Sequence, residues 1–375
     1  MTATMASRSV RTAKALVLTG PRQLDYLTVP VADVGPGDIL VETLFSGISH
    51  GTEMNVYRGV APQWANVYDR TLRLFLPAAE GEAAVPARGY WTAGDTHWGY
   101  PLAYGYANVG RVRETGADAT SVQTGDLVYA FKPHQTTYVA AAGEVIPLPP
   151  LTNPAQGVLY ANLNTAYNGV LDSDIRLDDT VVVFGQGVVG LLVTQFVRRT
   201  SARQVIVVDT LPHRRALALC MGADQALDPA HGDVALAVRR LTGGRGADVT
   251  IEVSGSYAAL QEAIRTAAPN TTVTAMSWYG GTGDALRLSD EFHHNRITIK
   301  SSQVGAIDPA LSATHSLARR ANQIHGAFAE LELEPLLSDY IPFTEAPRGY
   351  ELIDRHGERT TQVVLAYGQS PRADD

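Results

Sequence analysis

Short apolar runs alternate with helically periodic segments between residues 181 and 300. The runs at 181–184 (VVVF) and 204–208 (QVIVV) are typical of strands buried on both faces. Apolar residues that recur every three or four positions predict helices between such runs. This alternation predicts an α/β fold with a doubly wound parallel sheet. We expect its strands and helices at 181–184, 190–199, 204–208, 214–221, 234–241, 248–252, 258–267, 271–276 and 297–300.

The flanking parts of the chain have a different pattern. Strand-like runs with Gly-Asp turns dominate the first part, and a helical pattern begins at Asn153-Pro154. After Gln303 come one long helical pattern and two strand-like runs. We therefore predict a β-rich domain of residues 1–164 and 304–375, with residues 165–303 inserted as a second domain and ligands bound between the two. The flanking elements are expected at 13–18, 35–45, 110–114, 126–131, 311–328, 336–342 and 361–367.

A glycine-rich turn follows the first apolar run of the inserted domain. Gly185, Gly187 and Gly190 have the spacing of a dinucleotide-binding fingerprint, and Asp209 ends the next strand. Such a turn brings backbone close to a pyrophosphate, and the following helix directs unpaired N–H groups at it. A carboxylate at the end of the second strand meets the adenosine ribose. The pattern predicts a Rossmann domain that binds a nicotinamide dinucleotide.

Composition narrows the class of partner. The 375 residues are 45% hydrophobic and 18% charged, with a net charge of −8 and no basic run. These values favour a globular protein of two domains and argue against nucleic-acid or membrane partners. Cys220 is the only cysteine, so an internal disulfide and a multi-cysteine zinc site are excluded. We expect a cytoplasmic protein whose first residues are a frayed terminus rather than a targeting peptide.

Residues 60–100 form an unusual aromatic segment. It holds Trp64, Trp91 and Trp98 and is long for a connection inside a compact domain. Two interpretations stand equally: a lid over a binding site, or a small subdomain with its own aromatic core.

Three further segments carry a family resemblance: GPGDILVETLFSGISHGTE (35–53), YPLAYGYANVGRV (100–112) and GDLVYAF (125–131). With the glycine fingerprint and Asp209, they make the chain similar to the medium-chain dehydrogenase/reductase superfamily, over nearly its whole length. The closest resemblance is to the branch that contains bacteriochlorophyllide a dehydrogenase. The resemblance implies that the β-rich domain is GroES-like and catalytic.

The same resemblance implies a member without zinc. Ser49 and Tyr106 stand where relatives have their first two zinc ligands. If Thr165 is the cofactor-contacting threonine of the family, Ala161 stands at the third. A hydroxyl, a phenol and a methyl group do not supply the deprotonated ligands that zinc needs. The four-cysteine lobe of relatives is also missing.

The cofactor positions transfer more fully. Asp209 implies NAD(H) rather than NADP(H), although Arg214 and Arg215 could compensate a 2′-phosphate. His50 is expected at the pyrophosphate, and Met276, Ser302 and Val304 at the nicotinamide carboxamide. The full predicted set of cofactor-binding residues is Gly185, Gly187, Val188, Val189, Gly190, Asp209, Arg214, His50, Thr165, Ser254, Met276, Ser302 and Val304.

Without a metal, hydride transfer to a carbonyl needs a proton donor. Tyr106 is the first candidate, with cavity filling as its equal alternative, and Ser49 could bond the same oxygen. Thr52 could orient Tyr106, and His134 could act as acid or base on its short loop. Glu53 and Lys132 could line the cleft, but solvated surface charges are the stronger expectation for both.

These features predict a metal-free, NAD-dependent alcohol dehydrogenase or ketoreductase for a secondary alcohol, with a cyclic or bulky substrate suggested by the aromatic segment. Three alternatives stay open: an enone or quinone reductase, a non-catalytic nucleotide-binding protein, and a redox-neutral epimerase that keeps its NAD bound. The resemblance also implies a homodimer.

Overall fold

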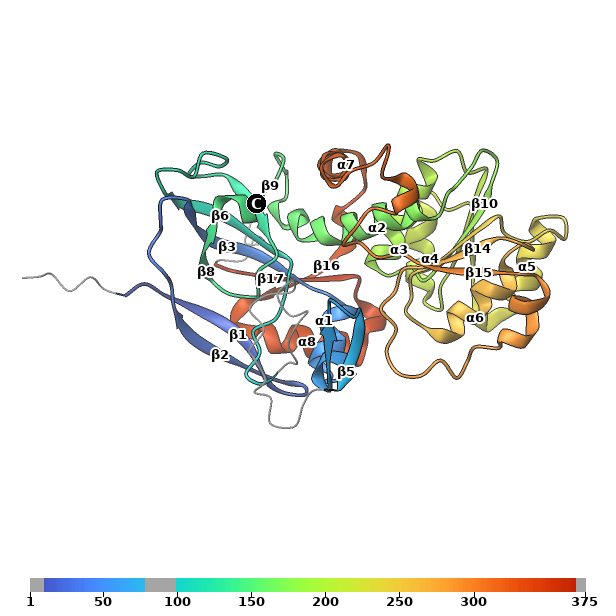
Figure 1. Ribbon diagram of the computed structural model, residues 1–375, viewed down its shortest axis with the longest axis horizontal. Helices are drawn as coiled ribbons and strands as arrows, with labels where there is room; N and C mark the ends of the chain where they lie inside the picture. Colours follow the sequence, from blue (N-terminus) through green and yellow to red (C-terminus); the bar gives the residue numbers. More distant parts are fainter. Residues whose placement is uncertain (1–9, 78–98, 369–375) are drawn as a thin grey trace, which may run out of the picture. The chain divides into compact units, whose positions relative to one another are not determined.

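The computed structural model describes residues 10–77 and 99–368. The chain divides into two compact units, the first formed by Met1–Val158 with Leu337–Asp375 and the second by Leu159–Leu336. The second unit is therefore one continuous insertion in the first (Figure 1).

A six-stranded parallel sheet forms the centre of the second unit, with the strand order β12-β11-β10-β13-β14-β15. The order reverses at β10, which carries the glycine turn at its carboxyl end, and this is the topological switch point where doubly wound folds bind ligands. The predicted α/β class is confirmed. The strands are β10 (Thr180–Phe184), β11 (Gln204–Val208), β12 (Gln225–Leu227), β13 (Val249–Glu252), β14 (Thr272–Ala275) and β15 (Thr298–Ser301).

Two helical layers cover this sheet (Figure 1). Helices α2 and α3 pack together against one face, and α5 and α6 pack together against the other. Val182, Phe184, Ile206 and Val208 point into the core beneath α5 and α6, while the intervening residues are buried on the other face, which explains the unbroken apolar runs. The helices are α2 (Tyr160–Asp172), α3 (Val188–Arg198), α4 (Pro212–Cys220), α5 (Val234–Leu241), α6 (Tyr257–Thr266) and α7 (Leu317–Glu330).

The first unit is built on a mainly antiparallel sheet with the order β16-β17-β3-β6-β7-β9, and β8 also pairs with β3. A separate β1–β2 hairpin, the β4–β5 hairpin and two helices accompany this sheet. The elements are β1 (Thr12–Gly20), β2 (Gln23–Pro30), β3 (Asp38–Ile48), α1 (Thr52–Tyr57), β4 (Asn66–Asp69), β5 (Leu74–Pro77), β6 (Asn108–Thr115), β7 (Leu127–Ala130), β8 (Thr137–Ala141), β9 (Ile146–Pro147), β16 (Leu337–Pro342), α8 (Ala346–His356) and β17 (Gln362–Ala366).

The division between the units differs from the predicted boundaries at 164 and 304. Helix α7 packs against α2 and stays with the parallel sheet, so the chain returns to the first unit only at Leu337. The predicted helix start at Asn153-Pro154 is also shifted, because Pro154–Leu159 forms 3₁₀ turns before α2 begins.

The aromatic segment is only partly described. Trp91 and Trp98 lie outside the described residues, while Trp64 stacks on Tyr100 with ring centroids 4.5 Å apart. That stack fits both the lid and the subdomain interpretation. In the part of the chain that the structure describes, no helix is both long and apolar enough to cross a membrane.

Candidate functional site

The glycine turn between β10 and α3 has three distinct local geometries. Gly185 has φ +90°, and a Cβ there would lie 2.7 Å from Ser254 Cβ. A Cβ on Gly190 would lie 1.9 Å from the carbonyl oxygen of Gly185, so this glycine permits close packing of helix on turn. At Gly187 the nearest atom to an added Cβ is Arg214 Nη1, at 3.9 Å. The space over Gly187 is therefore open where a pyrophosphate would approach.

Helix α3 begins directly after Gly187, with Val188 and Val189 as its first residues. The first N–H groups of a helix have no intrahelical acceptor and carry the positive end of its dipole. No side-chain cap satisfies them at Gly187. The turn thus has the shape and the polarity that fit a dinucleotide phosphate.

Asp209 follows β11 and faces this turn. Its Oδ2 accepts the Gln186 N–H at 2.6 Å and its Oδ1 accepts the Leu211 N–H at 2.8 Å. Asp209 is 8% exposed and lies near the guanidinium group of Arg214. Burial lowers the pKa of Arg214, and the charge of Asp209 partly opposes this shift. Arg215 is engaged elsewhere, because its Nη1 donates to the Asp209 carbonyl and its Nη2 pairs with Asp228 at 2.7 Å. Asp209 therefore fixes the glycine turn as well as its own loop.

The loops after β13 and β14 are held by a carboxylate that the sequence analysis did not single out. Glu252 is fully buried at the end of β13, and its Oε1 accepts the N–H and the hydroxyl of Ser254. The Tyr279 hydroxyl donates to its Oε2, and the Met276 N–H donates to its backbone carbonyl at 2.9 Å. Burial raises the pKa of Glu252. A carboxylate that ends an apolar strand before Ser-Gly is a sequence signal that could have identified it.

A second polar network holds the predicted nicotinamide positions Ser302 and Val304. The Ser302 hydroxyl donates to Asp172 Oδ2 at 2.6 Å, and the Ser302 N–H donates to the Ala275 carbonyl. Arg320 on α7 is 7% exposed and donates to the Val304 carbonyl at 2.8 Å and to Asn168 Oδ1 at 2.6 Å.

Two of the predicted cofactor positions lie on elements other than the glycine turn, the helices α3 and α4, and the loops of the parallel sheet. The Thr165 hydroxyl donates to the Ala161 carbonyl one turn earlier in α2, at 3.0 Å. His50 is half-buried in the first unit, just before α1. Like Thr165, the other predicted cofactor residues belong to the second unit. Gly185 and Gly187 lie on the glycine turn, Val188, Val189 and Gly190 at the start of α3, Arg214 on α4, and the rest on the loops after β11, β13, β14 and β15.

The first unit contains a buried hydrogen-bonded cluster around His134. His134 Nε2 lies 2.6 Å from Glu53 Oε1, and His134 Nδ1 lies 2.7 Å from the Ser46 hydroxyl. The Tyr350 hydroxyl donates to Glu53 Oε1, and Tyr367 Oη lies 2.8 Å from Ser46 Oγ. Both Glu53 and His134 are 1% exposed. The expectation of a solvated Glu53 is therefore wrong, and the loop position predicted for His134 is a buried one.

The remaining candidates surround this cluster. The Ser49 N–H donates to Glu53 Oε2 at 3.0 Å, while Tyr106 is half-buried and adjoins Gly105. Thr52 begins α1 and is half-buried, next to the buried Glu53. Tyr350 gave no sequence signal, because α8 was not predicted.

The residues at the family's zinc positions do not fit zinc. Ser49, Tyr106 and Ala161 supply two hydroxyl groups and a methyl group, and the buried His134 and Glu53 already bind each other. Within residues 10–77 and 99–368, no three His, Cys, Asp or Glu side chains gather in a way that could hold a metal ion.

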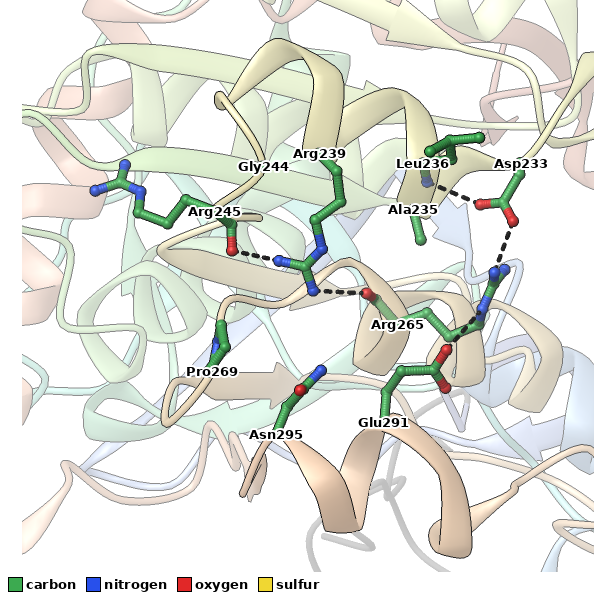
Figure 2. Close-up of a pocket in the computed structure, with 10 residues that line it drawn as sticks. All are labelled: Asp233, Ala235, Leu236, Arg239, Gly244, Arg245, Arg265, Pro269, Glu291 and Asn295. Atoms are coloured by element: carbon green, nitrogen blue, oxygen red, sulfur yellow. Dashed lines mark hydrogen bonds and ion pairs between the residues drawn. The ribbon is translucent and has the colours of Figure 1, made fainter.

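Figure 2 shows a pocket on the second unit, between α5, α6 and the segment before β15. Its arginines are already engaged: Arg239 donates to the carbonyls of Arg245 and Ala267, and Arg265 pairs with Asp233 and Glu291. None of the predicted site residues lines it. The pocket residues are Asp233, Ala235, Leu236, Arg239, Gly244, Arg245, Arg265, Pro269, Glu291 and Asn295.

Comparisons with known proteins agree with this arrangement. Residues 188–319 match the zinc-binding dehydrogenase family. D-guloside 3-dehydrogenase of Escherichia coli K12 is 27% identical over 361 residues, which cover 94% of this chain and all of that protein. The 2-desacetyl-2-hydroxyethyl bacteriochlorophyllide A dehydrogenase of Rhodobacter capsulatus is 26% identical, over 58% of this chain and 61% of that protein.

A solved structure, described as a zinc-binding dehydrogenase of Sinorhizobium meliloti 1021 bound to NADP, has the same fold. Its TM-score is 0.72 at 20% identity, with 95% of this chain and 99% of that chain covered. Together, the sequence matches support the place of this chain in the zinc-binding dehydrogenase superfamily, which includes the alcohol dehydrogenases. The chain is accordingly an oxidoreductase of the dehydrogenase class.

Proposed function

We propose that the protein transfers hydride between NAD(H) and a secondary alcohol or its ketone, without zinc. The observation that carries this proposal is the glycine turn, where the open space over Gly187 meets the start of α3 and the carboxylate of Asp209. The residues that would hold the cofactor are those of the turn and the loops that Glu252 and Arg320 fix.

NAD(H) is favoured over NADP(H) by charge. Asp209 is an anion at the end of β11, and a 2′-phosphate beside it would meet like charge. Arg215 already pairs with Asp228, so it is not available as a counter-charge. Arg214 remains the basic residue next to the turn, and it would have to neutralise both Asp209 and a phosphate to admit NADP(H).

The bound nicotinamide supplies or accepts the hydride. The protein then has to place a proton on the carbonyl oxygen as that oxygen gains charge. We assign this proton to the Tyr106 hydroxyl, with the Ser49 hydroxyl as a second hydrogen-bond donor to the same oxygen. In the oxidation direction, the Tyr106 side chain acts as the phenolate and takes the proton from the alcohol, which restores the hydroxyl.

A ring-borne secondary alcohol is the proposed substrate class. The E. coli relative is named as a dehydrogenase of a glycoside, and glycoside rings carry secondary alcohols. The stacked aromatic pair Trp64 and Tyr100 is suited to contact such a ring.

The test is oxidation of NADH or NADPH in the presence of excess EDTA, with sugar-derived and cyclic ketones in one panel and enones or quinones in another. Turnover of ketones with a preference for NADH is the expected result, and Tyr106→Phe should then lower kcat by about 10²–10⁴-fold, the usual contribution of a general acid. Turnover of enones or quinones alone would contradict the proposal and favour a reductase that delivers hydride to a β-carbon. Loss of all turnover on removal of metal would contradict the metal-free chemistry.

A further inference from the structure

The buried cluster joins three segments of the first unit at one carboxylate. Glu53 Oε2 receives the N–H of Ser49, while Glu53 Oε1 receives the Tyr350 hydroxyl from α8 and contacts His134 Nε2. Burial and the neighbouring carboxylate raise the pKa of Tyr350 well above its ordinary value, so its hydroxyl stays a donor. The Ser49 N–H and the Tyr350 hydroxyl thus both donate to Glu53, and His134 Nε2 lies within hydrogen-bonding distance of the oxygen that Tyr350 contacts.

His134 packs against Gly105, the residue before Tyr106. Gly105 has φ +125°, and a Cβ there would lie 2.8 Å from His134 Cδ2 and 2.9 Å from His134 Nε2. The imidazole thus lies directly against the backbone that precedes Tyr106. The His134 N–H donates to the Tyr104 carbonyl, which ties the same two segments together at the main chain.

We propose that Glu53 and His134 are a positioning pair, which fixes the main chain at Ser49 and at Gly105–Tyr106 so that the two hydroxyl groups meet the same substrate oxygen. The pair touches no substrate itself. This inference rests on the proposed function, because it gives that function the rigid support that its two donors need.

A purely space-filling role does not explain the choice of residues. A buried carboxylate and imidazole are costly to desolvate, and apolar side chains of similar volume are often as stable. The pair is embedded in an apolar core that includes Ile48, Met54, Leu102 and Tyr104. A polar pair at that position brings directional bonds to the main chain at Ser49, which apolar packing cannot supply.

The test compares Glu53→Gln with Tyr350→Phe. Glutamine keeps the shape of Glu53, but one of its two terminal groups is a donor, so it cannot accept from Ser49 and contact His134 and Tyr350 as before. We expect E53Q to lower kcat for ketone reduction at least tenfold, to leave the KM for NADH within about twofold, and to move the Ser49 and Tyr106 amide signals in NMR spectra. Y350F removes one donor and keeps the pair, so its kcat should stay within about threefold of the wild type.

Unchanged kcat and unchanged amide signals in E53Q would overturn the inference, as would an equal loss of kcat in Y350F. If E53Q does not fold, Ser46→Ala provides the same comparison, because it removes the hydroxyl that holds His134 Nδ1. A wild-type protein that reduces no ketone would overturn the proposed function only. The Ser49 and Tyr106 amide signals of the variants would then still decide whether Glu53 and His134 position those residues.

Discussion

Single residues of the glycine turn have different roles, as Gly187 and Gly190 show. Gly187 has φ −71°, which any residue can adopt, and open space beside its Cα. Gly190 instead has the Gly185 carbonyl oxygen where a Cβ would lie. Gly187→Ala should therefore fold with wild-type stability and weaken NADH binding at least tenfold, because the methyl group occupies the path of the pyrophosphate. Gly190→Ala should lower the free energy of unfolding by about 1–3 kcal/mol through overpacking.

Urea unfolding and titration of NADH fluorescence measure the two effects separately. Gly143→Ala is the matched control, since an added Cβ there meets no atom within 4 Å and the residue lies in the first unit. Wild-type affinity for NADH in Gly187→Ala would show that the cofactor does not cross the turn at this point.

Glu252 should give stability a pH dependence. Burial raises its pKa in the folded protein above the ordinary value of 4.5, so the folded state binds this proton more tightly than the unfolded state does. The stability that this tighter proton binding gives the folded protein is fully present below about pH 4.5, and it is lost as the pH rises through the raised pKa of Glu252. Relative to Glu252→Gln, the wild type should therefore lose free energy of unfolding as the pH rises from about 4.5 through the raised pKa of Glu252.

Chemical denaturation of both proteins across that range measures the difference. Glu144→Gln, a change at an exposed carboxylate of the first unit, is the control for general effects of removing one charge. Parallel curves for the wild type and E252Q would show that Glu252 titrates alike in both states.

Site residues could be predicted from the sequence only where the residue type itself indicates the role. Gly185, Gly187, Gly190 and Asp209 were identified because each has a backbone or charge role at a fixed distance from a strand. Glu53 was misjudged, since a carboxylate in a short helix is usually solvated and only its partners His134 and Tyr350 explain its burial. Those partners come from segments far apart in the chain, which local pattern does not reveal.

Among the secondary-structure elements, helix α7 supports the loop after β15 through a hydrogen bond from Arg320. Arg320 donates to Asn168 on α2 and to the Val304 carbonyl, and burial lowers its pKa. Arg320→Met would leave both acceptors buried without their donor, so we expect a loss of about 2–4 kcal/mol in the free energy of unfolding. NADH affinity should also fall, because Val304 lies at a predicted nicotinamide contact.

Arg319→Met is the control, as Arg319 is exposed and adjoins Arg320 in the same helix. Urea unfolding and NADH titration of the two variants provide the comparison. Equal behaviour of the Arg319 and Arg320 variants would mean that α7 does not support the loop after β15.

Elements were predictable where burial alone sets the pattern. The apolar strands β10 and β11 match their predicted positions because both faces of the sheet are covered. β2 and α8 were missed for the opposite reason: β2 is mostly exposed along its length, and α8 begins with Ala-Pro-Arg-Gly and has few apolar positions. The start of α2 was predicted too early, because Asn153-Pro154 begins a stretch of 3₁₀ turns and not the α-helix itself. A capping residue and a proline place the start of a helix only to within about a turn.

For the whole molecule, the order of the two units along the chain determines which unit can fold by itself. The second unit is continuous from Leu159 to Leu336, whereas the first needs segments from both ends of the chain to complete its sheet. The predicted homodimer stays a prediction. The parallel sheet has two edge strands, β12 and β15. The residues of both strands are half-buried or exposed in this single chain.

A fragment of residues 159–336 tests whether the second unit folds independently. It contains all six parallel strands, both helical layers and the apolar core beneath α5 and α6, so it should fold cooperatively by itself. Because the glycine turn, Asp209, Glu252 and Arg320 all lie within it, the fragment should bind NADH but reduce no ketone, since Tyr106 and Ser49 are in the other unit. Circular dichroism with urea, followed by NADH titration, measures both properties. A fragment that unfolds without cooperativity would show that the second unit depends on the first, and a folded fragment without NADH affinity would remove the glycine turn as the main cofactor site.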